Sequence, residues 1–179
     1  MNKLKKYFLE ANNKKYSKSK NQPVRFNINY NQAQTIGILF SSENIENIDA
    51  LTNFVKMLQQ DGKQVKALTF HHTENKKSLH TYNFNHHVIT DKDISNFGEI
   101  KSFLADDFIN AEFDYLLCID NNPSIVFENI LQKSKAKCRI GKFIEGQGYY
   151  ELMIKINENE GTDALMKQMY HYVKTIKND

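Results

Sequence analysis

The chain has 179 residues, enough for one domain and too few for two of ordinary size. About 27% of the residues are Leu, Ile, Val or Phe, well above the ~20% level below which disorder is expected. The formal net charge of +3 is too small for a domain that binds nucleic acid over its whole surface. We therefore expect a single folded unit with a sizeable core.

The positive charge lies at the N-terminal end of the chain. Residues 1–20 hold seven lysines and one acid, Glu10, so the remainder of the chain is slightly acidic. We divide the chain accordingly: residues 1–20 form a basic N-terminal amphipathic helix or arm, and residues 21–179 form a single α/β domain.

Leu4, Tyr7, Phe8 and Ala11 follow helical spacing and predict one apolar face of a short helix. We favour a structural role in which this face packs on the domain. Two alternatives stay open, a contact with a membrane surface and a contact with an anionic partner such as RNA. The residues that would make such an anionic contact are Lys3, Lys5, Lys6, Lys14 and Lys15.

Cysteine usage and the absence of targeting segments bear on the compartment. Cys118 and Cys138 sit in apolar, strand-like runs, where a reduced thiol behaves as a small hydrophobic side chain. We find no run near the ~18 apolar residues of a membrane-spanning helix. Residues 1–11 carry charges throughout, unlike the core of a signal peptide. We expect a cytoplasmic protein.

The first half of the chain contains one βαβ unit. Residues 35–40 read TIGILF, a short apolar run typical of a strand buried on both faces, and we expect it to be central. Ser41 and Ser42 can cap the helix that follows, which stops at Gly62. Residues 65–70 then give a second strand. Such units join parallel strands with a right-handed crossover.

The second half continues the alternation of strands and helices. We predict strands near residues 88–89, 113–119, 138–144 and 149–156, and helices at 99–109, from 122 and from 162. Residues 145–148 have the length of a hairpin loop, which predicts that the last strand is antiparallel. The fold class is therefore α/β, a three-layer Rossmann-like sandwich. Its sheet is mostly parallel, has five or six strands and ends in a C-terminal antiparallel edge strand.

Polar loops follow the first and fourth predicted strands. In open parallel sheets, ligands bind at the carboxyl ends of the strands, where the strand order reverses. The tentative ligand-binding residues in these two loops are Ser41, Ser42, Asp120, Asn121 and Asn122. Plain helix capping is the alternative explanation, since Ser and Asn are favoured caps. Glu43 and Asp120 would repel a phosphate.

Cofactor motifs are missing from the chain. The first strand is followed by serines and not by the glycines of G-x-G-x-x-G, and no G-x-x-x-x-G-K-[ST] occurs. Gly146 and Gly148 form the single G-x-G, which precedes a strand and fits a turn. We predict no bound cofactor.

Metal and nucleophile patterns are equally weak. The pairs His71-His72 and His86-His87 match no zinc spacing, so we predict no metal site and treat them as loop residues. Ser41 lacks the G-x-S-x-G context of a strained nucleophile turn. The catalytic residues, if there are any, are unknown from the sequence.

Several stretches resemble known families. Residues 35–70, 113–120, 136–141 (AKCRIG) and 150–154 (YELMI) are similar to a family of small Bacteroidota proteins catalogued as a domain of unknown function. This resemblance implies a Rossmann-like sandwich and assigns no activity. Residues 113–141 also resemble the N-terminal, acceptor-side half of heptosyltransferase-type glycosyltransferases. Those enzymes bind the nucleotide-sugar donor with a second domain, which 179 residues cannot include.

We expect a non-catalytic cytoplasmic module that binds an unknown protein partner or a small polar ligand. The strand-end loops carry amides and capping residues but no recognisable set of acid, base and nucleophile. The alternative is a small-molecule-binding enzyme, or a half-enzyme of glycosyltransferase type. It would act at the crevice with Ser41, Asp120 and Asn121.

Overall fold

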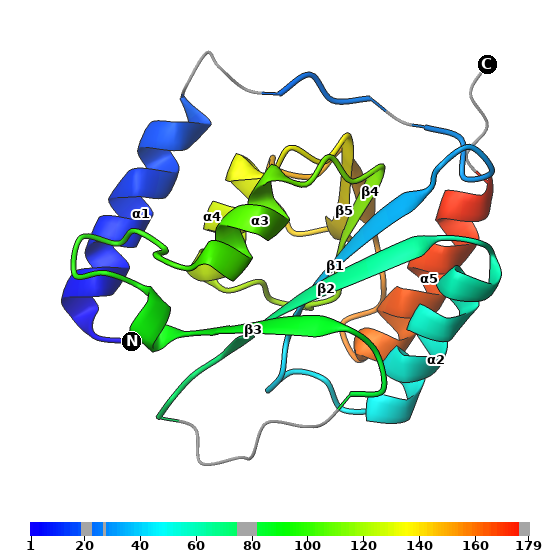
Figure 1. Ribbon diagram of the computed structural model, residues 1–179, viewed down its shortest axis with the longest axis horizontal. Coiled ribbons are helices and arrows are strands. Elements are labelled where there is room, and N and C mark those ends of the chain that lie inside the picture. Colours follow the sequence, from blue (N-terminus) through cyan, green and yellow to red (C-terminus); the bar gives the residue numbers. More distant parts are fainter. Residues whose placement is uncertain (19–22, 27, 75–81, 176–179) are drawn as a thin grey trace.

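A parallel sheet forms the centre of the molecule (Figure 1). The computed structural model describes residues 1–18, 23–26, 28–74 and 82–175. Within these residues, six strands pair in the order β3-β2-β1-β4-β5-β6, and every neighbouring pair is parallel. The strands are β1 (Thr35–Ser41), β2 (Gln64–His71), β3 (His86–Thr90), β4 (Tyr115–Cys118), β5 (Cys138–Lys142) and β6 (Leu152–Ile154). This is a doubly wound order that reverses between β1 and β4.

Helices cover both faces of the sheet, so the predicted three-layer fold is confirmed (Figure 1). One face carries α2 (Ile48–Gln60) and α5 (Thr162–Thr175). The other face carries α1 (Lys3–Ser17), α3 (Phe103–Asn110) and α4 (Ile125–Lys133). Among the described residues, no helix combines the length and the apolar character needed to cross a membrane.

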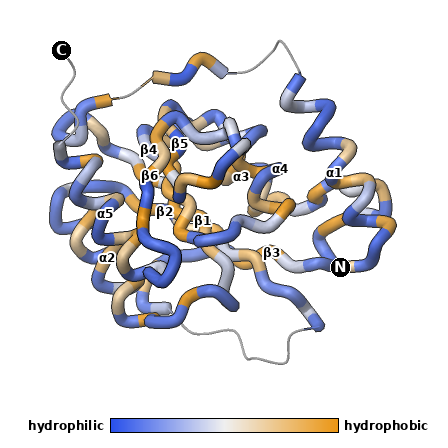
Figure 2. The backbone as a smooth tube through the Cα atoms, turned by 180° about the vertical axis from the view of Figure 1, so that it is seen from behind, coloured by the Kyte–Doolittle hydropathy of each residue, from blue (hydrophilic) through white to orange (hydrophobic). Residues whose placement is uncertain are grey.

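β1 is buried on both sides, as its apolar run predicts. Ile36, Ile38 and Phe40 pack toward α2 and α5, whereas Leu39 packs toward α3 and α4. Each such side chain contributes roughly 1.5–3 kcal/mol when it is fully buried. The apolar colouring of the central strands in Figure 2 follows this arrangement. The core is therefore two apolar layers separated by the sheet.

The predicted antiparallel edge strand is wrong. β6 runs parallel to β5, with Ile140 opposite Leu152. The connection turns at Gly146 and returns over the α3/α4 face, where Tyr149 and Tyr150 are buried. Nine residues suffice for this crossover because β6 is only three residues long. The loop at residues 145–148 has the length of a hairpin loop, and this led to the wrong strand direction. The connection is instead a crossover in which two packed tyrosines take the place of a helix.

α1 packs on α4 through a face that the spacing of its apolar residues did not predict. Leu9 and Asn13 are buried, while Leu4 and Tyr7 point to solvent. Asn13 donates to the carbonyl of Ile125 (3.1 Å) and accepts from the Asn129 amide (2.5 Å). A polar side chain whose hydrogen bonds are made can be buried at little cost.

Candidate functional site

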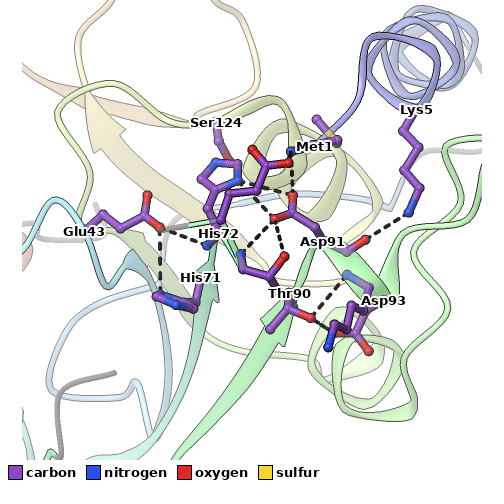
Figure 3. Close-up of polar contacts among 12 residues, drawn as sticks. Met1, Lys5, Glu43, His71, His72, Thr90, Asp91, Asp93 and Ser124 are labelled. Carbon is purple, nitrogen blue, oxygen red and sulfur yellow. Dashed lines mark hydrogen bonds and ion pairs between the residues drawn. The ribbon is translucent and has the colours of Figure 1, made fainter. Parts of the chain in front are cut away.

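The loops that leave β1, β2, β3 and β4 meet at one edge of the sheet. We call residues 41–44, 71–73, 90–93 and 120–124 the strand-end crevice. Parallel strands bring these loops together because their carboxyl ends share one edge. Polar side chains link the loops, as Figure 3 shows for Glu43, His72 and Asp91.

The two loops predicted from the sequence do meet at the point where the strand order reverses. The Asn44 amide donates to both carboxylate oxygens of Asp120, at 2.9 and 3.0 Å, and the Asn122 backbone N–H donates to one of them at 3.1 Å. Asp120 is only 1% exposed. The Asn121 amide turns away and donates to the carbonyl of Glu160 (3.2 Å). The loops therefore enclose a carboxylate.

Ser41 and Ser42 do not cap the following helix, so that expectation is wrong. Ser41 ends β1, and the α2 cap is Asn47, whose side chain accepts from Ala50 N–H at 3.0 Å. The Ser42 N–H instead donates to the carbonyl of Phe70 (3.3 Å). Ile45 is buried in the loop, and this apolar anchor delays the start of the helix.

Asp120 is a buried acid whose environment disfavours ionisation. Burial raises its pKa to about 6, and the nearby Glu43 charge adds to the rise. Hydrogen bonds from Asn122 and Asn44 lower the pKa without cancelling the effect of burial. A carboxylate kept at such a position costs stability at neutral pH, which is typical of functional sites.

Asp120→Asn is expected to become more stabilising as the pH rises. The folded pKa of about 6 exceeds the ordinary value of 3.8, so ionisation favours the unfolded chain between these two pH values. Below about pH 4 this contribution vanishes. The difference in unfolding free energy, variant minus wild type, should therefore increase by about 2–3 kcal/mol between about pH 4 and pH 8. Urea unfolding across this range measures it.

The matched control for this experiment is Asp107→Asn, because Asp107 is an exposed acid outside the crevice. Its hydrogen bond from Lys66, together with the charge of Lys66, lowers its pKa, so its pH dependence should have the opposite sign. A difference between Asp120→Asn and wild type that stays constant with pH would contradict the assignment.

His71 lies at the end of β2 and contacts two polar groups of the β1 loop. The Ser42 hydroxyl is 3.1 Å and the Glu43 carboxylate 3.8 Å from the same ring nitrogen, Nδ1. A Ser-His-acid relay needs the hydroxyl and the carboxylate on opposite nitrogens. His71 is also buried. We assign this contact a structural role.

The adjacent His72 has a different environment. Its Nδ1 lies 3.2 Å from Asp91, a buried carboxylate that also accepts from Thr73 N–H at 2.9 Å. Burial alone would raise the pKa of Asp91, but the Thr73 hydrogen bond, the Met1 amino group and His72 lower it. Asp91 therefore stays ionised and orients the imidazole. This arrangement leaves Nε2 as the ring nitrogen that can contact a ligand.

A cavity of about 500 Å³ opens beside His72. This volume is in the range that small-molecule sites occupy. Ser124, the cap of α4, lies next to the His72 ring in Figure 3 and lines the same cavity. The lining residues are Met1, Lys6, Glu10, His72, Ser124, Ile125, Val126 and Glu128.

The sequence did not single out His72, Asp91 or Ser124 as site residues. His72 and Asp91 each follow a strand, so extending the strand-end rule to β2 and β3 could have found them. The two histidine pairs do not meet, since His86 begins β3 opposite Ala67, four residues before the end of β2.

The parallel sheet, the helices on both faces and the polar crevice at the reversal point define a doubly wound, Rossmann-like α/β protein. The chain belongs to a family of unknown function, DUF6913, which matches residues 4–176. The predicted resemblance to a domain of unknown function is thus confirmed. Neither the family match nor the searches of curated proteins and solved structures support a glycosyltransferase link or a particular bacterial phylum. No curated protein and no solved structure gives a significant match.

Proposed function

We propose that this protein is a binding module that takes up a small polar ligand at the strand-end crevice. The observation that carries the proposal is the cavity of about 500 Å³ beside His72. His72 and Ser124 join the cavity to the carboxyl edge of the parallel sheet, where doubly wound proteins bind ligands, and the N-terminal segment with α1 and the start of α4 supply its other walls. Asp91 holds the His72 ring in place, so the site is organised before a ligand enters.

The cavity walls differ in charge, and this favours a ligand with two kinds of group. The backbone N–H groups at the start of α4 and the Lys6 side chain suit an anionic group. Glu10 and Glu128 suit a cationic group. Burial raises the pKa of Glu128, and the charge of Glu10 raises it further, so a bound cation would relieve both effects. A small zwitterion such as an amino acid combines the two groups.

A thermal-shift screen tests the binding proposal. The screen compares amino acids, nucleotides, nucleotide sugars and sugar phosphates. A ligand at 100 times its Kd stabilises the folded state by roughly 2.7 kcal/mol, which raises the Tm by about 5 °C or more in a chain of this size. His72→Ala and Glu128→Gln should each remove most of the shift.

His86→Ala is the matched control, because His86 lies at the start of β3, away from the crevice. It should leave the ligand-induced shift unchanged. The proposal fails if none of these ligands shifts the Tm, or if His72→Ala keeps the full shift.

Acid-base catalysis in the same cavity is a second candidate, and the Asp91–His72 contact favours it. A carboxylate on Nδ1 fixes the tautomer in which Nε2 can take up a proton. The test follows a ligand found in the screen by NMR over hours in the presence of the protein. Turnover of the ligand that is lost in His72→Gln would support the enzyme. If the ligand stays unchanged, the binding module is the function that remains supported.

The compartment that we propose is the cytoplasm. Cys118 is fully buried, and burial raises the pKa of its thiol. Such a thiol is a packing group in a reducing environment.

A further inference from the structure

The outward face of α1 carries an apolar patch. Leu4 is 56% exposed, Tyr7 66% and Phe97, from the loop before α3, 69%. The rings form a chain, with centroids 5.6 Å apart for Tyr7 and Phe8 and 6.0 Å apart for Phe8 and Phe97. We call Leu4, Tyr7, Phe8 and Phe97 the outer patch. Scattered exposed apolar residues are ordinary, but a contiguous group marks an interaction site.

The fold holds the outer patch in position. The Asn12 side chain donates to the carbonyls of Phe97 (3.0 Å) and Gly98 (3.1 Å), which fixes the loop against α1. Gly98 packs directly on the helix backbone at Phe8 and Leu9. Phe97 is therefore presented beside Phe8 although neither contact buries it.

Exposed lysines continue the face of α1 that carries the outer patch. Within residues 1–18, Glu10 is the one acid among six lysines. Helical spacing places Lys14, Lys15 and Lys18 on the same side of the chain as Leu4 and Tyr7. Lys14, Lys15 and Lys18 are exposed in the structure. Lys5, in contrast, is used internally, because its ammonium donates to the carbonyl of Asp91 at 3.1 Å.

We infer that the outer patch docks the protein on an anionic lipid surface. Apolar side chains at the outermost face of a helix, with lysines beside them, match the interfacial helices that lie in the headgroup region. The lysines complement negative headgroups, and the apolar side chains enter the acyl boundary. RNA would use the lysines and can stack on Tyr7 and Phe97, but it would gain little from Leu4, which cannot stack on a base.

Vesicle co-sedimentation tests the inference with the full chain. The wild type should bind vesicles of phosphatidylcholine mixed with phosphatidylglycerol, and bind far less to phosphatidylcholine alone. Leu4→Ser with Phe97→Ser should weaken this binding tenfold or more, because two exposed apolar side chains no longer enter the lipid. Lys14→Gln with Lys15→Gln should weaken it about tenfold, and added salt should do the same to the wild type.

Matched controls come from the opposite face of the sheet. Met57→Ser on α2 and Lys167→Gln on α5 change an exposed apolar residue and an exposed lysine there. Both variants should bind the mixed vesicles like the wild type. Equal losses in these controls and in the outer-patch variants would overturn the inference.

A tryptophan reporter gives a second readout that does not depend on lost binding. The chain contains no tryptophan, so Tyr7→Trp creates a single reporter in the outer patch. Its emission should shift to the blue with mixed vesicles and be quenched by brominated lipids. Tyr172→Trp, exposed on α5 across the sheet, should show neither effect.

Three further results would overturn the inference. The first is a wild type that does not sediment with mixed vesicles. The second is unchanged emission from Tyr7→Trp in their presence. The third is binding to single-stranded RNA in preference to vesicles, with Leu4→Ser having no effect on it.

Discussion

Gly98→Ala is expected to lower the free energy of unfolding by about 3–4 kcal/mol and to release α1 from the domain. Gly98 has φ +68°, a backbone conformation that residues with a side chain rarely adopt. A Cβ there would also meet the backbone of α1 at Phe8 and Leu9, and backbone cannot move aside as a side chain can. Urea unfolding gives the loss of stability, and hydrogen exchange should show lost protection throughout α1.

Gly62→Ala separates the two causes of this effect. Gly62 has a similar positive φ, +79°, but no atom lies within 4 Å of the position that its Cβ would take. It should therefore cost only about 1 kcal/mol, the contribution of backbone conformation. If Gly98→Ala is no more destabilising than Gly62→Ala, the close approach of the loop to α1 does not hold the helix.

Asp114→Ala is expected to cost about 3 kcal/mol, because one carboxylate organises the start of three strands. Asp114 precedes β4 and accepts from Gln34 N–H (2.7 Å) and Thr35 N–H (3.0 Å) at the start of β1. Lys137, just before β5, donates to its other oxygen at 2.7 Å. Removing the carboxylate leaves these donors without their acceptor. Chemical denaturation measures the loss.

Acidic pH should reduce the difference in unfolding free energy between Asp114→Ala and the wild type. Burial alone would raise the pKa of Asp114, but Lys137 and the N–H groups of Gln34 and Thr35 bring it below the ordinary 3.8. The stabilisation is therefore present above about pH 4 and is lost as the pH falls through the folded pKa. Asp107→Ala on the surface, whose partner is Lys66, is the control and should change stability little. A cost for Asp114→Ala that persists at about pH 2 would contradict this account.

Hydrophobic patterns predicted the strands with most success. Residues 35–40 and 113–119 are short apolar runs, and they form the buried strands β1 and β4, which pair with each other at the centre of the sheet. Such patterns could not predict the direction of β6. It depends on the Tyr150 ring packing over Gly141, a contact that the order of residues along the chain does not reveal.

The candidate site was predicted in part. Asp120 and the loop after β1 were expected to lie together because both follow parallel strands, and Asn44 does join them. The pairing of His72 with Asp91 was missed, since the two residues lie in a polar region without periodicity. Their meeting depends on the register between β2 and β3, which places His71 opposite Thr90.

The sequence by itself determined the layered α/β architecture. Burial of apolar strands and helix faces is the dominant favourable contribution to folding, and the spacing of apolar residues along the chain reveals which segments are buried. Only the tertiary structure decided which face of α1 is outward. The spacing of Leu4 and Tyr7 marks an apolar face, but hydrogen bonds from Asn12 and Asn13 to distant carbonyls turn the opposite side inward. Such long-range polar contacts have no periodicity along the chain, and here they leave an apolar, lysine-rich surface exposed.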